Sequence, residues 1–140
     1  GDKVSYITIE RTNQDSMRNA LSDKHFDVVI DKIAYCSNDI KYALDVVNCD
    51  KYIHMSSTAV YHPKHINTVE DDYNPISEKL IWCNRTDFPY DEIKRHAENA
   101  LFQEYAKQKS IAVRYPVVLG KMTILNDCFS TWSILSKEFR

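Results

Sequence analysis

Short runs of β-branched and aromatic residues alternate along the chain with stretches in which apolar residues recur at helical spacing. The short runs are typical of strands, because branched and aromatic side chains suit a pleated, half-buried surface. They predict strands at residues 4–9, 26–31, 51–57 and 111–119. The run at 26–31 is apolar almost throughout, which favours a strand buried on both faces of a parallel sheet.

The stretches with helical spacing predict helices. A short first helix surrounds residues 17–21, and a second begins at a cap formed by Ser37 or Asn38 and continues to Val47. A final helix is expected at 124–139. Strands and helices therefore alternate along the chain.

The strongest helical pattern follows residue 88. Asp87 can cap this helix, and Pro89 suits its first turn. Its apolar stripe consists of Ile93, Ala97, Ala100, Leu101 and Tyr105. Before it, residues 58–88 have little periodicity, and so long an irregular segment in a compact domain is usually a functional loop.

The alternation of strand and helix defines the fold class that we predict. Parallel strands joined by right-handed helical crossovers form a doubly wound α/β sheet. Ligands of such sheets bind at the carboxyl ends of the strands. The segments after Ile30, Met55 and Val118 are therefore the places where we expect chemistry.

Composition narrows the expected partners. The 140 residues are the size of one domain, and 44% apolar with 27% charged residues is typical of a soluble globular domain. The net charge of −2 is spread without long runs of one sign, so we expect neither nucleic acid nor a membrane as partner. The four cysteines lack metal-ligand spacing, which favours reduced thiols in a cytoplasmic protein and no metal site.

Glycine usage excludes one kind of site. Gly1 and Gly120 are the only glycines in the sequence, where average usage predicts roughly ten. A glycine-rich phosphate loop is therefore absent from this sequence.

Tyr90 and Lys94 are the strongest candidates for chemistry. Residues four apart on a helix share a face, so the Lys94 ammonium can lie near the Tyr90 phenol. A positive charge there favours the phenolate form, and the tyrosine can then act as acid or base near neutral pH. The spacing alone is weak evidence, because Tyr105 and Lys109 repeat it further along the helix, where we interpret the pair as packing plus a terminal charge.

Four motifs occur in a fixed order along the chain. They are FDVVIDKIA at 26–34, IHMSSTAVY at 53–61, Tyr90-x-x-x-Lys94 with Glu98, and RYPVVLG at 114–120. In this order they resemble the extended short-chain dehydrogenase/reductases, specifically the NAD-dependent epimerase/dehydratase family that acts on sugar nucleotides. The combination is far more specific than any one motif.

The resemblance implies a fold and a reaction. The fold would be the central part of a Rossmann-like domain, a three-layer α/β/α arrangement with a partial parallel sheet, truncated at its N-terminus and comprising residues 1–140 as one domain. The reaction would be hydride transfer between a nucleotide sugar and NAD or NADP. Tyr90 would move the proton of the substrate hydroxyl, Ser57 would hydrogen-bond the same oxygen, and Lys94 would hold the nicotinamide ribose.

The resemblance also implies contacts with both ligands. The cofactor-binding residues would be Lys32, Ile33, Ala34, Ser56, Tyr90, Lys94 and Pro116. The small-molecule substrate would contact Thr58 and Tyr61, with the acidic loop around 70–75 nearby. The family often pairs through the helices after its fourth and fifth strands, so a homodimer is the assembly implied.

Two departures from the family bear on activity. The first strand and its Gly-x-x-Gly-x-x-Gly loop, which places pyrophosphate against a helix N-terminus, are absent. The residues after Gly120 do not resemble the family's substrate-binding portion. We therefore expect a fragment of a larger enzyme or a degenerate relative, inactive and a poor binder of dinucleotide by itself, and the choice between NAD and NADP stays open.

Other interpretations stay open beside this one. A non-catalytic Rossmann-like binding or regulatory module, with RNA association as one form of it, fits the missing cofactor loop. A structural fragment that associates through an exposed sheet edge is a third interpretation. His62 and His65 near the acidic loop could be drawn as a metal site, but without a third fixed ligand a solvated loop is favoured.

Overall fold

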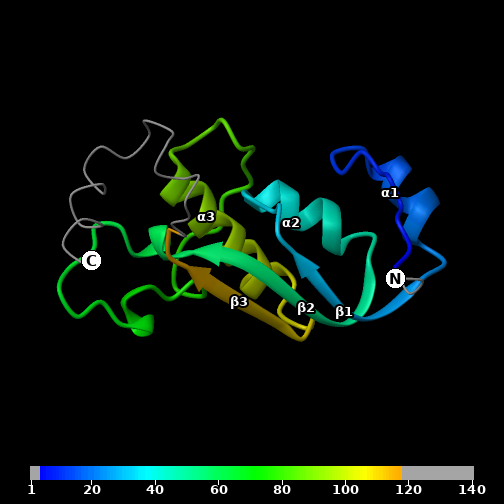
Figure 1. Ribbon diagram of the computed structural model, residues 1–140. Helices are drawn as coiled ribbons and strands as arrows, with labels where there is room; N and C mark the ends of the chain where they lie inside the picture. The colour runs from blue at the N-terminus through cyan, green and yellow to red at the C-terminus, as the bar shows by residue number, and fades with distance from the viewer. Residues whose placement is uncertain (1–3, 118–140) are drawn as a thin grey trace, which may run out of the picture.

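A three-stranded parallel sheet is the centre of the computed structural model, which describes residues 4–117 of the chain. The strands are β1 (His25–Asp31), β2 (Asn48–Ser57) and β3 (Ser110–Tyr115), and they lie side by side in that order (Figure 1). Both neighbouring pairs are parallel. The sheet and its helices confirm the predicted α/β class.

Helices connect the strands and cover one face of the sheet. The crossovers are α2 (Ser37–Leu44) and α3 (Tyr90–Asn99), and α3 continues into the π-helical turn η3 (Ala100–Glu104). These two helices pack against each other on the same side of the sheet, while α1 (Gln14–Leu21) lies beside β1 (Figure 1). The predicted alternation of strand and helix is thus confirmed from residue 14 to residue 115.

The core lies between the sheet and the two crossover helices. Ile40 of α2, Tyr52 of β2 and Leu101 of η3 are each fully buried there. Small residues, Ala43 on α2 and Ala97 on α3, let the helices approach the sheet and each other. The predicted apolar stripe of α3 is therefore the face that packs on the core.

The opposite face of the sheet carries apolar side chains without a covering element among residues 4–117. Ile30, Ile53 and Ile111 are direct neighbours across the three strands, and Ile30 is 59% exposed. The prediction that the strand at 26–31 is buried on both faces is wrong for the described residues, because β1 is an edge strand with only one covered face. Residues 4–117 also contain no helices on this second face of the sheet, so they do not form the third layer of the expected α/β/α arrangement (Figure 1).

The strand predicted at residues 4–9 is also wrong. Residues 4–10 have no regular secondary structure, and the Tyr6 side chain is 90% exposed. A strand needs a neighbour to pair with, and β-propensity mostly reflects packing on such a neighbour. No described strand pairs with this segment.

Helix starts differ from the predicted caps by one or two residues. Cys36, rather than Ser37 or Asn38, is the N-cap of α2. Pro89 is the N-cap of α3, and the Asp87 carboxylate instead accepts a hydrogen bond from the Asn84 N–H at 2.7 Å. Such shifts are usual, because several polar residues near a helix start can satisfy its free N–H groups.

The segment between β2 and α3 is mostly irregular, as predicted. Two short 3₁₀ turns interrupt it, η1 (Thr58–Tyr61) and η2 (Glu70–Asp72). The strand predicted at 111–119 ends in the structure at Tyr115, since the following proline has no N–H to donate. The predicted helix at 124–139 lies outside the described residues. None of the helices within residues 4–117 has the length and apolar character to cross a membrane.

Candidate functional site

Lys94 lies at the carboxyl ends of the strands, where the topology predicts a site. Its ammonium donates to the carbonyl of Ala34 at 3.0 Å and to that of Met55 at 2.9 Å. Ala34 belongs to the turn after β1, and Met55 lies near the end of β2. Lys94 therefore joins two neighbouring strand ends, and only 3% of its surface is exposed.

The charge of Lys94 is balanced between burial and nearby carboxylates. Burial lowers the pKa of Lys94 to about 8, although Asp31, Glu98 and Asp39 act in the opposite direction. Burial has the larger effect because an ammonium loses its hydration there. Lys94 can consequently gain or lose a proton close to neutral pH.

Tyr90 begins α3 one turn before Lys94, and its ring is 48% exposed. Its hydroxyl makes no hydrogen bond to any residue that the structure describes. The ring of Tyr35 connects the two residues: its centre is 5.0 Å from the Lys94 nitrogen and 6.3 Å from the centre of the Tyr90 ring. Each member of the predicted pair therefore contacts Tyr35, while no hydrogen bond joins the Tyr90 hydroxyl to the Lys94 ammonium within residues 4–117.

The two serines at the end of β2 have different partners. Ser57 caps η1, with its hydroxyl accepting from the Ala59 N–H at 3.1 Å. The buried Ser56 hydroxyl donates to the Glu98 carboxylate. Since side chains alternate along a strand, only one of the two faces the core. Ser57 is the one left near the surface.

Arg114 is a residue of this region that the sequence motif included but gave no role. It pairs with the fully buried Glu98 at 2.7 Å and donates to the Tyr61 hydroxyl at 2.6 Å. It also donates to the main-chain carbonyls of Glu70 and Tyr73. One guanidinium thereby fixes the loop after β2 to both β3 and α3, and it occupies the hydroxyl of the predicted substrate residue Tyr61.

A polar network around the Asp31 carboxylate fixes the turn after β1. The Asp31 carboxylate accepts from the N–H groups of Ile33 and Ala34 at 3.1 and 3.0 Å, and from Arg11 and Tyr52. Burial acts to raise the pKa of Asp31, but the Arg11 charge and these hydrogen bonds outweigh it and hold the pKa below its usual value. No sequence spacing could have identified Arg11, because it lies 20 residues before its partner.

His54 is buried beneath Lys94 on the inner face of β2. It is fully buried, and neither ring nitrogen has a hydrogen-bond partner within the described part of the chain. Burial, with the Lys94 charge adding to it, lowers the pKa of His54 to about 3. This histidine therefore stays neutral at physiological pH.

The remaining predicted ligand residues all lie near the same edge of the sheet. Lys32, Ile33 and Pro116 are exposed. Ala34 and Ser56 are buried, and their polar groups are occupied by Lys94 and Glu98. The Thr58 hydroxyl accepts a hydrogen bond from Lys64 at 3.0 Å. Among these predicted ligand residues, the exposed Lys32, Ile33 and Pro116 are therefore the ones whose side chains are free to contact a ligand.

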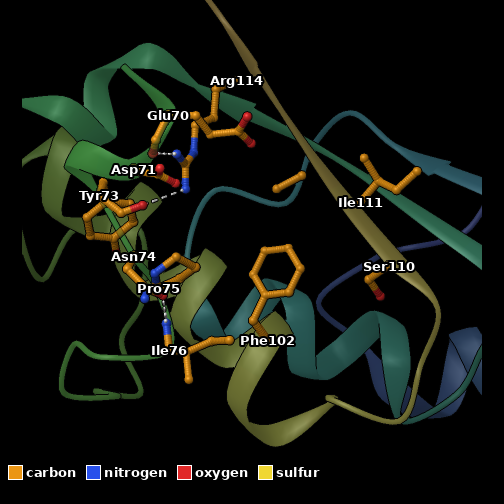
Figure 2. Close-up of a pocket in the computed structure, with 11 residues that line it drawn as sticks. Glu70, Asp71, Tyr73, Asn74, Pro75, Ile76, Phe102, Ser110, Ile111 and Arg114 are labelled. Carbon is orange, nitrogen blue, oxygen red and sulfur yellow. Dashed lines mark hydrogen bonds between the residues drawn. The ribbon is translucent and has the colours of Figure 1, made fainter. Parts of the chain in front are cut away.

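A pocket of about 560 Å³ lies elsewhere, between β3, η3 and the loop that carries η2 (Figure 2). Phe102, Pro75, Ile76 and Ile111 give it apolar walls, and Glu70 lies at its edge. None of Ser57, Tyr90 and Lys94 lines it. This cavity is therefore separate from the predicted catalytic residues.

The described residues include two groups of side chains that could bind a metal ion, although the sequence predicts no metal site. His62 and His65 pair separately, with Asp91 at 3.4 Å and Asp72 at 3.0 Å. A different group, His25, Asp27 and Asp50, has ligand atoms within 4.8 Å of one another at the amino ends of β1 and β2. All three of those side chains are exposed, and they lie at the end of the strands opposite Lys94.

Comparison of the chain with protein-family models, with curated proteins and with solved structures finds no match.

Proposed function

We propose that this chain carries the acid–base residues of an NAD(P)-dependent oxidoreductase of the epimerase/dehydratase type, with a Rossmann-like fold and a nucleotide sugar as substrate. The observation that carries the proposal is the position of Lys94. Its ammonium is fixed by the Ala34 and Met55 carbonyls at the carboxyl edge of a parallel sheet, with Tyr90 one helical turn away. Ligands of parallel α/β sheets bind at this edge.

The donors at this edge fit one part of the cofactor. A lysine ammonium has three protons, and two of those on Lys94 go to carbonyl groups, so one is left for a ribose hydroxyl. Ile33 and Pro116 offer exposed apolar surface for a flat ring. When bound there, a nicotinamide would supply the hydride chemistry that none of these side chains can perform.

The chain's own residues would handle the proton. The Tyr90 hydroxyl is exposed and would take the proton of a substrate hydroxyl or return it. Ser57, which is partly exposed at the end of β2, would hydrogen-bond the same substrate oxygen.

Binding of nicotinamide mononucleotide to the full chain tests the proposal, because this half of the cofactor needs no pyrophosphate loop. Titration followed by NMR should perturb the signals of Lys94 and Ile33. Lys94→Met should abolish the effect and Lys109→Met should not. Equal perturbation in both variants, or none in the wild type, would contradict the proposal.

A second candidate function is supported by the same contacts. The two carbonyl groups that Lys94 binds give it a structural role without any ligand. Under this alternative the chain is a non-catalytic binding or regulatory module in which Lys94 only ties β1 to β2. Lys94→Met would then lower stability, and nicotinamide mononucleotide would not bind even to the wild type.

A further inference from the structure

We propose that Tyr35 is a positioning residue of this site. Its ring keeps water away from the Lys94 ammonium and holds the Tyr90 ring through an edge-to-face contact. Any contribution of Tyr35 to catalysis rests on the proposed function, but its effect on the pKa of Lys94 does not. Tyr35 belongs to none of the four sequence motifs.

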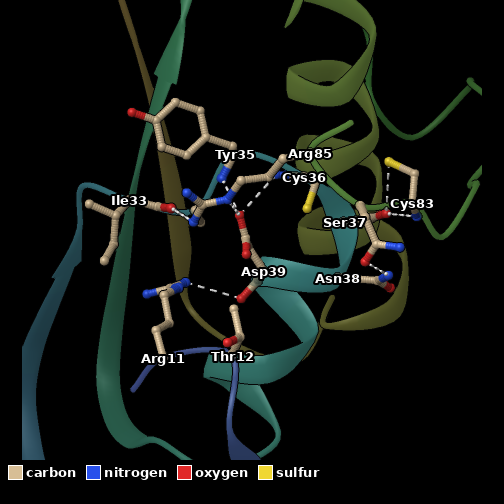
Figure 3. A network of polar contacts seen from close by, with 12 residues as sticks. Arg11, Thr12, Ile33, Tyr35, Cys36, Ser37, Asn38, Asp39, Cys83 and Arg85 are labelled. Atoms are coloured by element: carbon tan, nitrogen blue, oxygen red, sulfur yellow. Dashed lines mark hydrogen bonds and ion pairs between the residues drawn. The ribbon is translucent and has the colours of Figure 1, made fainter. Parts of the chain in front are cut away.

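The backbone of Tyr35 is held at the start of α2. Its N–H donates to the Asp39 carboxylate at 2.8 Å (Figure 3). Asp39 is itself buried and is bound by Arg85 at 2.9 Å. The residue that carries the ring is therefore anchored independently of the ring's own contacts.

Three side chains meet at the Tyr35 ring. The Arg85 guanidinium lies 4.6 Å from its centre and the Lys94 nitrogen 5.0 Å. The Tyr90 ring contacts it edge-on, at 6.3 Å and an interplanar angle of 62°. Cations are attracted to the face of an aromatic ring, and edge-to-face contact is a favoured geometry for aromatic pairs. The ring can thus order both neighbours at once.

Arg85 is fixed as well, so the ring is held between anchored groups. Besides Asp39, it donates to the Ile33 carbonyl at 2.8 Å. Ile33 and Asp39 belong to the segment that contains Tyr35 itself. A rotation of the ring away from Lys94 would give up its contacts with Arg85 and Tyr90 together.

Removal of the ring should raise the proton affinity of Lys94. Water that reaches the ammonium favours the charged form more than the lost attraction of one ring disfavours it, because hydration is the larger of the two effects. The low pKa of Lys94, about 8, agrees with a covered amine. The other charged or titratable groups that act on Lys94 are Asp31 from β1, His54 from β2, Asp39 from α2, Glu98 from α3 and Arg85 from the loop. All of them stay in place when only Tyr35 is changed.

The experiment measures the pKa of the Lys94 amine in the full chain. NMR titration of the Lys94 side-chain carbon next to the amine, with its signal assigned by its absence in Lys94→Met, gives that pKa without any reagent having to reach the buried group. Tyr35→Phe keeps the ring and should reproduce the wild-type profile. Tyr35→Ala should shift the profile to higher pH by about one unit, which is about a fivefold loss of free amine at pH 8. Lys109 is the internal reference, and its profile should not move.

The results separate this inference from the proposed function. An unchanged Lys94 profile in folded Tyr35→Ala overturns the role of Tyr35. If that variant does not fold, Tyr35→Leu replaces the ring with a smaller apolar group, and an unchanged profile there also overturns it. A shifted profile supports the inference that the Tyr35 ring shields Lys94 from water, even if the protein does not bind nicotinamide mononucleotide. The lack of binding would then contradict only the proposed function.

Discussion

Tyr90 and Lys94 at the start of α3 have the same spacing as Tyr105 and Lys109 beyond its end, yet the two pairs lie in different surroundings. Lys94 is buried and joins the ends of β1 and β2. Lys109 is exposed, and only its main chain takes part in structure, accepting from the Tyr52 N–H at 2.9 Å. The Tyr105 hydroxyl donates to the Asp45 carboxylate at 2.5 Å, whereas that of Tyr90 is free of the described residues.

The course of the backbone, rather than the spacing in the sequence, decides what such a pair of residues can do. Tyr105 lies where the helix has ended, with φ −101° and ψ 32°. Residues four apart share a face only on a continuous helix, so Tyr105 and Lys109 do not form a pair. Tyr90 and Lys94 are both within α3 and at the sheet edge where ligands bind.

The largest expected effect concerns turnover. In a form of the protein that turns over, Tyr90→Phe should lower kcat by about 10²–10⁴-fold, the usual contribution of a positioned acid or base. Tyr105→Phe should leave kcat unchanged. Steady-state kinetics of the two variants checks this, and equal rates would mean that the pairs do not differ in function.

Next in size is the ionic anchor of α3. Arg114→Met should lower the free energy of unfolding by about 3–5 kcal/mol, because it leaves the buried Glu98 carboxylate without its partner. Urea denaturation measures the loss. Arg18→Met removes an exposed pair of α1 and should change stability by no more than about 1 kcal/mol. A small loss for both variants would show that Glu98 is not effectively buried.

The dependence of stability on pH should differ between the two lysines. The folded pKa of Lys94, about 8, is below the ordinary lysine pKa of 10.5, so between these two pH values the unfolded state binds more protons. The free energy of unfolding should therefore rise with pH in that window, by up to about 1.4 kcal/mol per pH unit from this group. Lys94→Met should remove this rise and Lys109→Met should keep it, as urea denaturation at pH 8 and pH 10 would measure. A rise of the same slope in both variants would rule out Lys94 as its source.

The smallest expected effect concerns stability, to which the hydroxyl of Tyr105 should contribute and that of Tyr90 should not. Tyr105→Phe should lower the free energy of unfolding by about 1 kcal/mol through loss of its hydrogen bond to Asp45. That bond also helps to keep the pKa of Asp45 low against the opposing effect of burial, so NMR titration should find a higher pKa in the variant. Tyr90→Phe should change neither quantity, since its hydroxyl has no partner in the described structure.

Local patterns predicted most of the secondary structure, because they reflect the side of each element that packs. The stripe from Ile93 to Leu101 predicted α3 and its buried face. The strand predicted at 4–9 failed because pairing partners are not a local property. For the same reason the strand at 26–31 was wrongly predicted to be buried on both faces, because local sequence does not reveal which strand lies at the edge of a sheet.

The candidate site was predictable only where its members lie close in sequence. Tyr90 and Lys94 are one helical turn apart, and Ser57 follows a predicted strand. Arg85 and Tyr35, by contrast, are 50 residues apart and meet only after folding, as do Arg114 and Tyr61. Aromatic and guanidinium groups that come together over such distances leave no periodic signal.

The tie that Lys94 makes between Ala34 and Met55 has a consequence for how the sheet comes apart. At the amino ends of β1 and β2 the exposed carboxylates of Asp27 and Asp50 lie within 4.8 Å of each other, and the contact between His25 and Asp50, at 3.2 Å, is exposed to solvent as well. The carboxyl ends are clamped by the ammonium instead. Local opening should therefore start at the acidic end and travel toward the lysine, so that amide protons exchange with solvent first near Phe26 and last near Met55.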